Sequence, residues 1–230
     1  MKALYLSLHL FTISFPLIRS FEPRLHYAFK WKALFPAIFI TATFFIIWDA
    51  LFTRMDVWGF NEAYILGIKF FSLPIEEWLF FITVPFASVF IYESVYFFLP
   101  DIQSNLSTKL FSGAIAITLI TISIINADKA YTHWSFLFAS IFLVFVLMTN
   151  APWLGKFWIA YFIHLLPFIL VNGVLTGSFI QEPVVKYNNN QNLGIRLFTI
   201  PIEDTVYALL LLLMNITFYE YFLTRFKIRT

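Results

Sequence analysis

The chain has 230 residues, of which 60% are hydrophobic, 21% aromatic and only 12% charged, and its mean hydropathy is +0.81. This composition excludes an ordinary soluble domain and is typical of a membrane protein. The net charge of +2 is too small, and the basic residues are too scattered, to indicate nucleic-acid binding. Because the sequence has no cysteine, disulfides and thiolate metal ligands are excluded as well.

Seven apolar segments follow one another along the chain, most of them close to the roughly 20 residues needed to cross the hydrocarbon core. The first segment lacks the small-residue cleavage site of a signal peptide, so we interpret it as a retained membrane helix. The expected fold is an all-α, polytopic membrane helix bundle of about seven transmembrane helices. The segments are expected at residues 3–18, 32–52, 74–99, 110–127, 134–148, 157–179 and 201–224.

One twelve-residue stretch occurs twice in the sequence. LGIKFFSLPIEE at residues 66–77 returns as LGIRLFTIPIED at residues 193–204, with seven of the twelve positions identical. An internal repeat of this kind determines the architecture of the chain. It predicts two parallel three-helix repeats, residues 1–100 and 131–230, joined by a connector helix within residues 101–130.

The basic residues of the loops predict the orientation of the chain in the membrane. Nine Lys and Arg residues fall on the side of the carboxy terminus, and six fall on the other side. We therefore expect the carboxy terminus and the first loop to lie in the cytoplasm, with the protein in the cell (inner) membrane.

Each copy of the repeated stretch ends in a pair of acids, Glu76 with Glu77 and Glu203 with Asp204, at the start of an apolar segment. Ionisable side chains are costly in a membrane and are therefore candidates for function. The structural alternative is that these acids only stabilise the positive end of a helix dipole. Because the pair occurs in both repeats behind the same LGI element, we favour the functional interpretation and consider all four acids candidate catalytic residues.

Asp49 is expected at the membrane depth of the first acid pair, because it lies near the end of the preceding apolar segment. Comparison of IIWDALFT with ILVNGVLT gives Asn172 as its counterpart in the second repeat. Acids crowded together in a low dielectric cannot all ionise, so at least one is expected to hold its proton near neutral pH. A protonated carboxyl group is what general-acid catalysis requires, and Asp49 and Asn172 are expected to support it.

Two further acids, Glu93 and Glu220, also recur between the repeats. Glu93 lies 17 residues after Glu76, which corresponds to about 26 Å along a helix. We therefore expect both acids at the opposite interface, ionised in water and serving as anchors. The histidines have no metal-ligand spacing, and a hydrogen bond to a neighbouring helix is the favoured role of His9 and His164, with proton transfer as the alternative.

Aromatic residues follow the first acid pair directly, including Trp78, Phe80 and Phe81. They are expected either to pack against lipid and other helices or to line a substrate pocket in which ring faces stabilise a cation. No Gly-rich dinucleotide turn occurs, and neither a cofactor nor a metal ion is expected.

The stretch PIEEWLFF at 74–81 and the stretch PIED at 201–204, set in two three-helix repeats, resemble the small integral-membrane lycopene cyclases. That family includes bacterial cyclases of two separate subunits, fused single-chain forms, and the cyclase half of fungal bifunctional carotenoid enzymes. The resemblance spans nearly the whole chain, including the connector helix of a fused form. The second motif departs from the first after Asp204, where Thr-Val-Tyr replaces Trp-Leu-Phe, so the two halves are not necessarily equivalent in catalysis.

The resemblance implies that the chain cyclises lycopene, a linear C40 polyene, to β-carotene. An acid would protonate the terminal double bond, a neighbouring double bond would close the ring, and a base would remove a proton. Substrate and product are isomers, so no redox cofactor is implied, and the partners are a lipophilic carotenoid and membrane lipid. The sequence leaves open the ring type, whether one or both ends close, and the oligomeric state.

Two other classes of function remain compatible with the sequence alone. A multi-pass transporter also uses repeats and intramembrane acids, although the acids here fall at helix ends and no inverted symmetry appears. A carotenoid-binding protein without catalysis is the second alternative, and it would not require the acids.

Overall fold

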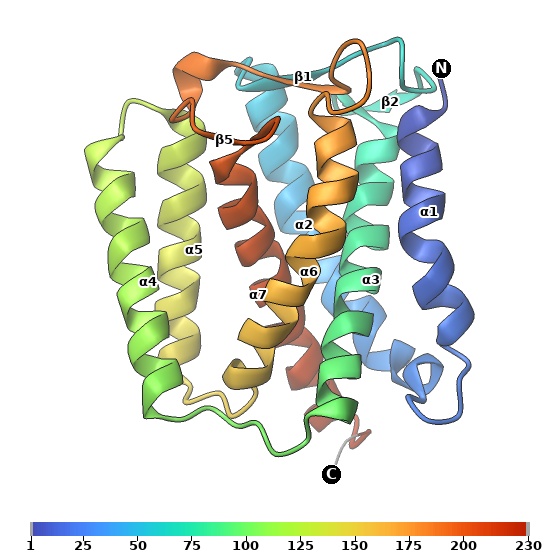
Figure 1. Cartoon of the computed structure of the whole chain (residues 1–230), viewed down its shortest axis with the longest axis vertical. Coiled ribbons are helices and arrows are strands. Elements are labelled where there is room, and N and C mark those ends of the chain that lie inside the picture. Colours follow the sequence, from blue (N-terminus) through green and yellow to red (C-terminus); the bar gives the residue numbers. More distant parts are fainter. Residues whose placement is uncertain (1, 229–230) are drawn as a thin grey trace.

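A computed structural model of the chain describes residues 2–228, and within that range seven α-helices lie side by side with the two termini at opposite ends of the bundle (Figure 1). This confirms the expected all-α helix bundle. The helices are α1 (Leu4–Arg19), α2 (Trp31–Arg54), α3 (Ile75–Phe98), α4 (Leu106–Ile125), α5 (Ala130–Met148), α6 (Leu154–Leu175) and α7 (Ile202–Arg225).

Six of the helices, α2 to α7, are long and apolar enough to cross a membrane. Helix α1 has 16 residues and extends only about 24 Å, so it is the shortest of the seven described helices and is not among the six. Large apolar side chains such as Phe11, Phe39 and Leu166 cover the outer faces of the bundle. Exposed apolar surface of this kind is stable in lipid and not in water, and the protein is therefore a membrane protein.

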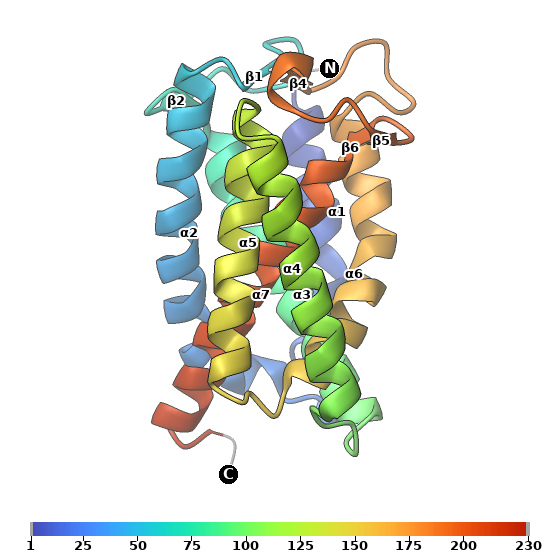
Figure 2. The same cartoon turned by 90° about the vertical axis from the view of Figure 1, so that its left-hand side faces the viewer.

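The two repeats run in the same direction through the bundle. Helices α3 and α7 begin and end at positions that are 127 residues apart, in agreement with the repeat offset in the sequence. Helices four places apart run parallel, so α1 corresponds to α5, α2 to α6 and α3 to α7. Helix α4 lies at the edge of the bundle against α5, whereas α7 contacts α2, α3, α5 and α6 (Figures 1 and 2).

The repeated LGI…PIE stretch forms a β-hairpin that leads directly into a helix. Strands β2 (Lys69–Phe70) and β3 (Leu73–Pro74) pair antiparallel before α3, and β5 (Arg196–Leu197) pairs with β6 (Ile200–Pro201) before α7. The glycine of each copy, Gly67 or Gly194, has a positive φ of 86° or 71°. Side chains with a Cβ avoid this conformation, which explains why both copies have glycine there.

A third strand pair joins the two repeats above the helices. Strand β1 (Trp58–Phe60) pairs antiparallel with β4 (Val185–Tyr187), and Trp58 lies opposite Tyr187. Each strand belongs to the long loop of a different repeat, so their pairing holds both loops over the end of the bundle where α3 and α7 begin (Figure 1). The 3₁₀-helices η1 (Tyr27–Lys30) and η2 (Asn189–Gln191) complete the regular structure.

The opposite end of the bundle holds the acids Glu93 and Glu220. Glu93 is 1% exposed, forms an ion pair with Lys30 and accepts a hydrogen bond from the Tyr219 hydroxyl at 3.0 Å. In the reciprocal contact, the Tyr92 hydroxyl donates to Glu220 at 2.6 Å. The expectation that water surrounds Glu93 is therefore wrong, because α7 and Lys30 cover it and supply its partners. These contacts fasten α3 to α7.

The ion pair between Lys30 and Glu93 gives a first prediction. Removing one partner of a buried ion pair costs about 3–5 kcal/mol, because the other charge stays in a low dielectric. Lys30→Met should therefore lower the thermal unfolding midpoint of the detergent-solubilised protein. Lys32→Met is the matched control, since Lys32 is exposed. Equal midpoints for the two variants would contradict a stabilising role of the pair.

Candidate active site

A cavity of about 360 Å³ lies between α1, α3, α6 and the first turns of α7. Asp49, Glu77 and Asp204 line one end of it, and these three acids are only 3%, 7% and 5% exposed. Further along, the lining is mostly apolar and includes residues on the outer surface of the bundle, Phe11 and Phe15 of α1. The cavity therefore connects three buried acids with the lipid-facing surface.

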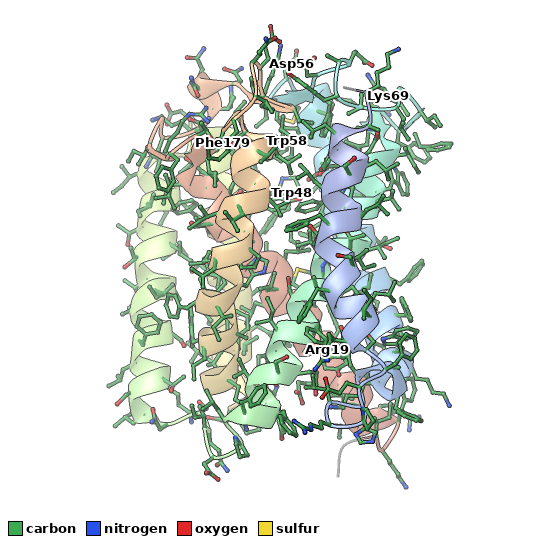
Figure 3. All side chains as sticks on the ribbon, turned by 45° about the vertical axis from the view of Figure 1, so that its right-hand side comes forward. Arg19, Trp48, Asp56, Trp58, Lys69 and Phe179 are labelled. Carbon is green, nitrogen blue, oxygen red and sulfur yellow. The ribbon has the colours of Figure 1, made fainter. Side chains whose placement is uncertain are left out.

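Figure 3 views the bundle from the side where α1 and α6 face each other. The labelled Trp58 and Trp48 lie between these two helices in this view. Trp58 belongs to β1 and is part of the cavity lining, near the acids.

Asp49 of α2 and Glu77 of α3 line the same end of the cavity. The Tyr207 hydroxyl donates to Asp49 at 2.6 Å, and the Tyr5 hydroxyl donates to Glu77 at 2.6 Å. These four residues come from four different helices, so the arrangement exists only in the folded bundle.

Asp204 of α7 accepts three hydrogen bonds. The Tyr131 hydroxyl donates to its Oδ1 at 2.5 Å, while the Asn172 amide and the Tyr187 hydroxyl donate to its Oδ2 at 2.6 and 2.9 Å. Burial and the charge of Asp204 raise the pKa of Tyr187, which lies in the loop outside the helices, well above its usual value. Tyr187 therefore remains a neutral donor to Asp204.

The two acid groups correspond to each other through the repeat, with one difference. Glu77 and Asp204 are equivalent, and each accepts a bond from a tyrosine near the start of α1 or α5, Tyr5 or Tyr131. The difference lies in the residue that α2 and α6 contribute, which is Asp49 in the first repeat and Asn172 in the second. An amide can donate without titrating, whereas Asp49 can donate only when protonated.

The first acid of each pair has a different role from the second. Glu76 accepts the backbone N–H of Leu66 at 2.7 Å, and Glu203 accepts that of Leu193 at 2.7 Å and the Thr132 hydroxyl at 2.7 Å. Both acids are buried, and neither lines the cavity. Each therefore fastens its LGI segment to the helix start, while the following acid faces the cavity.

The three predicted aromatic residues lie in three different places. Phe80 lines the cavity. Phe81 is buried in the core and stacks on Phe45 with a ring distance of 5.8 Å. Trp78 lies outside the cavity, where its ring approaches that of Phe70 at 6.4 Å in the hairpin.

His9 of α1 and His164 of α6 each bond to a neighbouring helix, as favoured from the sequence. His9 Nδ1 lies 2.9 Å from the Thr83 hydroxyl, and His164 Nδ1 lies 3.0 Å from the Ser88 hydroxyl. Nε2 is buried without a hydrogen-bond partner in both residues. Only His164 lines the cavity, at a point eight residues before Asn172 on α6, which corresponds to about 12 Å.

Tyrosines are the residues of this site that sequence reasoning missed. Tyr5, Tyr131, Tyr187 and Tyr207 donate to the three cavity acids, and none of them follows a known motif. The sequence contains one indication of two of them, because Tyr5 and Tyr131 are separated by nearly the repeat offset of 127 residues. The other two tyrosines have no such relation in the sequence.

Three buried acids, held by hydroxyl and amide donors, lie at the end of a mostly apolar cavity inside the helix bundle, an arrangement that suits an enzyme with acid–base chemistry. The comparisons with known proteins agree with this class. The family model described as lycopene cyclase matches residues 2–95 and 128–222. The chain therefore belongs to the lycopene cyclase family, a family of enzymes. Comparison with curated proteins and with solved structures gives no match.

The contacts of Glu203 give a second prediction. Glu203→Ala removes the acceptor of Leu193 N–H and of the Thr132 hydroxyl, and each buried donor left without a partner costs about 1–3 kcal/mol. Glu203→Gln keeps a carbonyl acceptor in place. The alanine variant should therefore unfold at a clearly lower temperature in detergent than the glutamine variant. The same loss in both would mean that the charge, and not the hydrogen bonding, holds the loop.

Proposed function

We propose that the protein is a lycopene cyclase that converts linear lycopene to β-carotene by acid-initiated, redox-neutral cyclisation. The observation that carries the proposal is the group of three buried acids at the end of a cavity that reaches the lipid-facing surface. A hydrocarbon substrate dissolved in the bilayer can enter such a cavity without passing through water. Membership of the lycopene cyclase family supports the same activity.

The pair of Asp49 and Glu77 is the proposed general acid. Both carboxyl groups are buried at the same end of the cavity, where two negative charges side by side are costly, so one of the two is proposed to hold a proton. The Tyr5 hydroxyl donates to Glu77 and the Tyr207 hydroxyl donates to Asp49. The comparison with Asn172 supports this assignment, because an amide donates to Asp204 where Asp49 faces Glu77. Transfer of this proton to the terminal double bond of lycopene would leave a tertiary carbocation.

Asp204 is the proposed anionic counterpart of that cation and the base of the reaction. Three donors compensate its charge in the fold, so it can stay ionised although it is buried. A fixed carboxylate beside the reacting carbons would stabilise positive charge as it develops. It could then accept the proton that leaves the ring.

Aromatic rings around the acids would assist the same step. Trp58, Phe80 and Tyr207 line the cavity, and the Trp58 ring lies 5.0 Å from that of Tyr131. Ring faces attract cations, so these rings would stabilise the carbocation as it forms.

The reaction balances without a reductant or oxidant. One proton is added to the terminal double bond, one carbon–carbon bond closes the six-membered ring, and one proton leaves a ring carbon. The product is an isomer of the substrate. Loss of the proton that gives the conjugated ring double bond yields the β ring, and chromatography against ε- and γ-ring standards distinguishes the alternatives.

A third prediction concerns the three cavity acids. Asp49→Asn, Glu77→Gln and Asp204→Asn preserve shape but remove the titrating group, so each should lower cyclisation by about 10²–10⁴-fold. We would measure ring formation in cells that accumulate lycopene, relative to the amount of protein in the membrane. Asp101→Asn is the control, since Asp101 is exposed. Near-normal cyclisation by all three variants would overturn the site assignment.

A fourth prediction concerns the origin of the added hydrogen. If an exchangeable carboxyl group starts the reaction, turnover in heavy water should place one deuterium in each ring, at the protonated carbon. Mass spectrometry of the product, after equilibration of the membranes in heavy water, measures this directly. Rings formed without deuterium under these conditions would exclude the proposed acid.

A further inference from the structure

The parallel repeats imply two equivalent grooves around the acids. The cavity is lined by α1, α3 and α6, and the repeat relates these helices to α5, α7 and α2. A second groove would therefore be expected between α5, α7 and α2 if the two halves were packed alike. Figure 3 looks at the first side of the bundle, and Figure 2 looks toward α2 and α5 on the other.

The groove between α1 and α6 is lined by several rings and, at four positions, by side chains smaller than an aromatic ring. Thr12 of α1, Ala87 of α3, and Pro167 and Val171 of α6 all line it. Its lining extends along α3 from Glu77 to Ile91, 14 residues or about 21 Å. It thus offers a long channel for an extended chain.

The equivalent positions on the other side are occupied by large side chains. The counterparts of Thr12, Pro167 and Val171 are Phe138, Phe44 and Trp48. These three rings pack against one another. The ring centroid of Trp48 lies 5.2 Å from that of Phe138 and 5.7 Å from that of Phe44, and the centroids of Phe44 and Phe138 are 5.7 Å apart. Met214 replaces Ala87 in the same way. We name Phe44, Trp48 and Phe138 the aromatic plug.

A lycopene molecule has two identical ends, and in the part of the chain that the structure describes the groove between α1 and α6 leads to the acids. The polyene is stiff because its double bonds are conjugated, so it cannot fold back within the groove and present its second end. While one end is at the acids, the rest of the chain must extend along the groove and out past Phe11 and Phe15 into the lipid.

We propose that the protein binds and cyclises one end of its carotenoid per binding event and releases the monocyclic product before any second ring is formed. The inference rests on the proposed function and extends it from the chemistry to the order of events. The aromatic plug enforces this order of events. It fills the equivalent groove between α5, α7 and α2, through which the other end of the substrate would otherwise have to approach the acids. The far end of the substrate lies in lipid and is not recognised.

A pulse–chase experiment with isotope-labelled lycopene tests this order. Membranes containing the protein would receive labelled lycopene briefly, followed by an excess of unlabelled lycopene. If the product is released between the two ring closures, labelled monocyclic carotene should accumulate to at least ten times the amount of enzyme. The unlabelled chase should then suppress the conversion of this labelled monocyclic carotene to any bicyclic product. A monocyclic end product would agree equally. Bicyclic carotene formed from the first turnovers, insensitive to the chase, would overturn the proposal.

A variant of the open groove tests the route. Val171→Trp introduces the residue that the repeat has at position 48 and should lower ring formation at least ten-fold. Ala87→Met is a smaller change, which introduces the residue that the repeat has at position 214, and it should lower ring formation less. Val144→Trp is the control, because Val144 lies exposed on the outer face of α5. Thermal unfolding in detergent separates a blocked groove from a misfolded chain, and full activity of folded Val171→Trp would refute the route.

The two proposals fail in different ways. Wild-type membranes that form no cyclic carotene from lycopene would refute the proposed function itself. Cyclic carotene that appears only as a chase-resistant bicyclic product would leave the function intact and refute the release step.

Discussion

The structure depends on one constraint, which is that buried acids must find partners where no water can supply them. Five acids at the loop end of the helices are less than 10% exposed, namely Asp49, Glu76, Glu77, Glu203 and Asp204. Backbone N–H groups, hydroxyls and an amide contact them, and these donors come from four of the seven helices and from both long loops. These contacts form only when the helices and both loops are in place, because each donor must be brought to its acid. One oxygen each of Glu76 and Glu203 stays buried without a hydrogen-bond partner.

Both repeats supply hydrogen-bond donors to their buried acids, but the two copies differ in detail. The first acid of each pair kept the same task, to hold its loop to its helix, so Glu76 and Glu203 bind equivalent backbone groups. The cavity acids differ, because Asn172 replaces the aspartate that faces Glu77 in the first repeat. One half thus places two carboxyl groups at the cavity, and the other places a single carboxyl group that accepts three hydrogen bonds. Acid and base functions can be divided between halves in this way.

The same divergence separates the lipid-facing sides. The cavity opens on the side of α1 and α6, whereas the aromatic plug fills the corresponding space beside α2 and α5. A symmetric fold therefore carries an asymmetric site. At the far end, by contrast, the contacts of Tyr92 with Glu220 and of Tyr219 with Glu93 keep the symmetry, because they join the halves and take no part in the cavity.

The sequence by itself determined the membrane class, the seven helices, the parallel repeats and the acid pairs, because hydrophobic length and an internal repeat are properties of the chain alone. Only the tertiary structure decided which acid faces the cavity. Successive helical residues point about 100° apart, so Glu76 and Glu77 face different surroundings, and the rotation of α3 is set by its neighbours. Helix packing also forms the hydrogen bond between Tyr207 and Asp49, which are 158 residues apart in the sequence, and it buries Glu93. Such contacts have no signal in a single sequence, because they depend on which helices become neighbours.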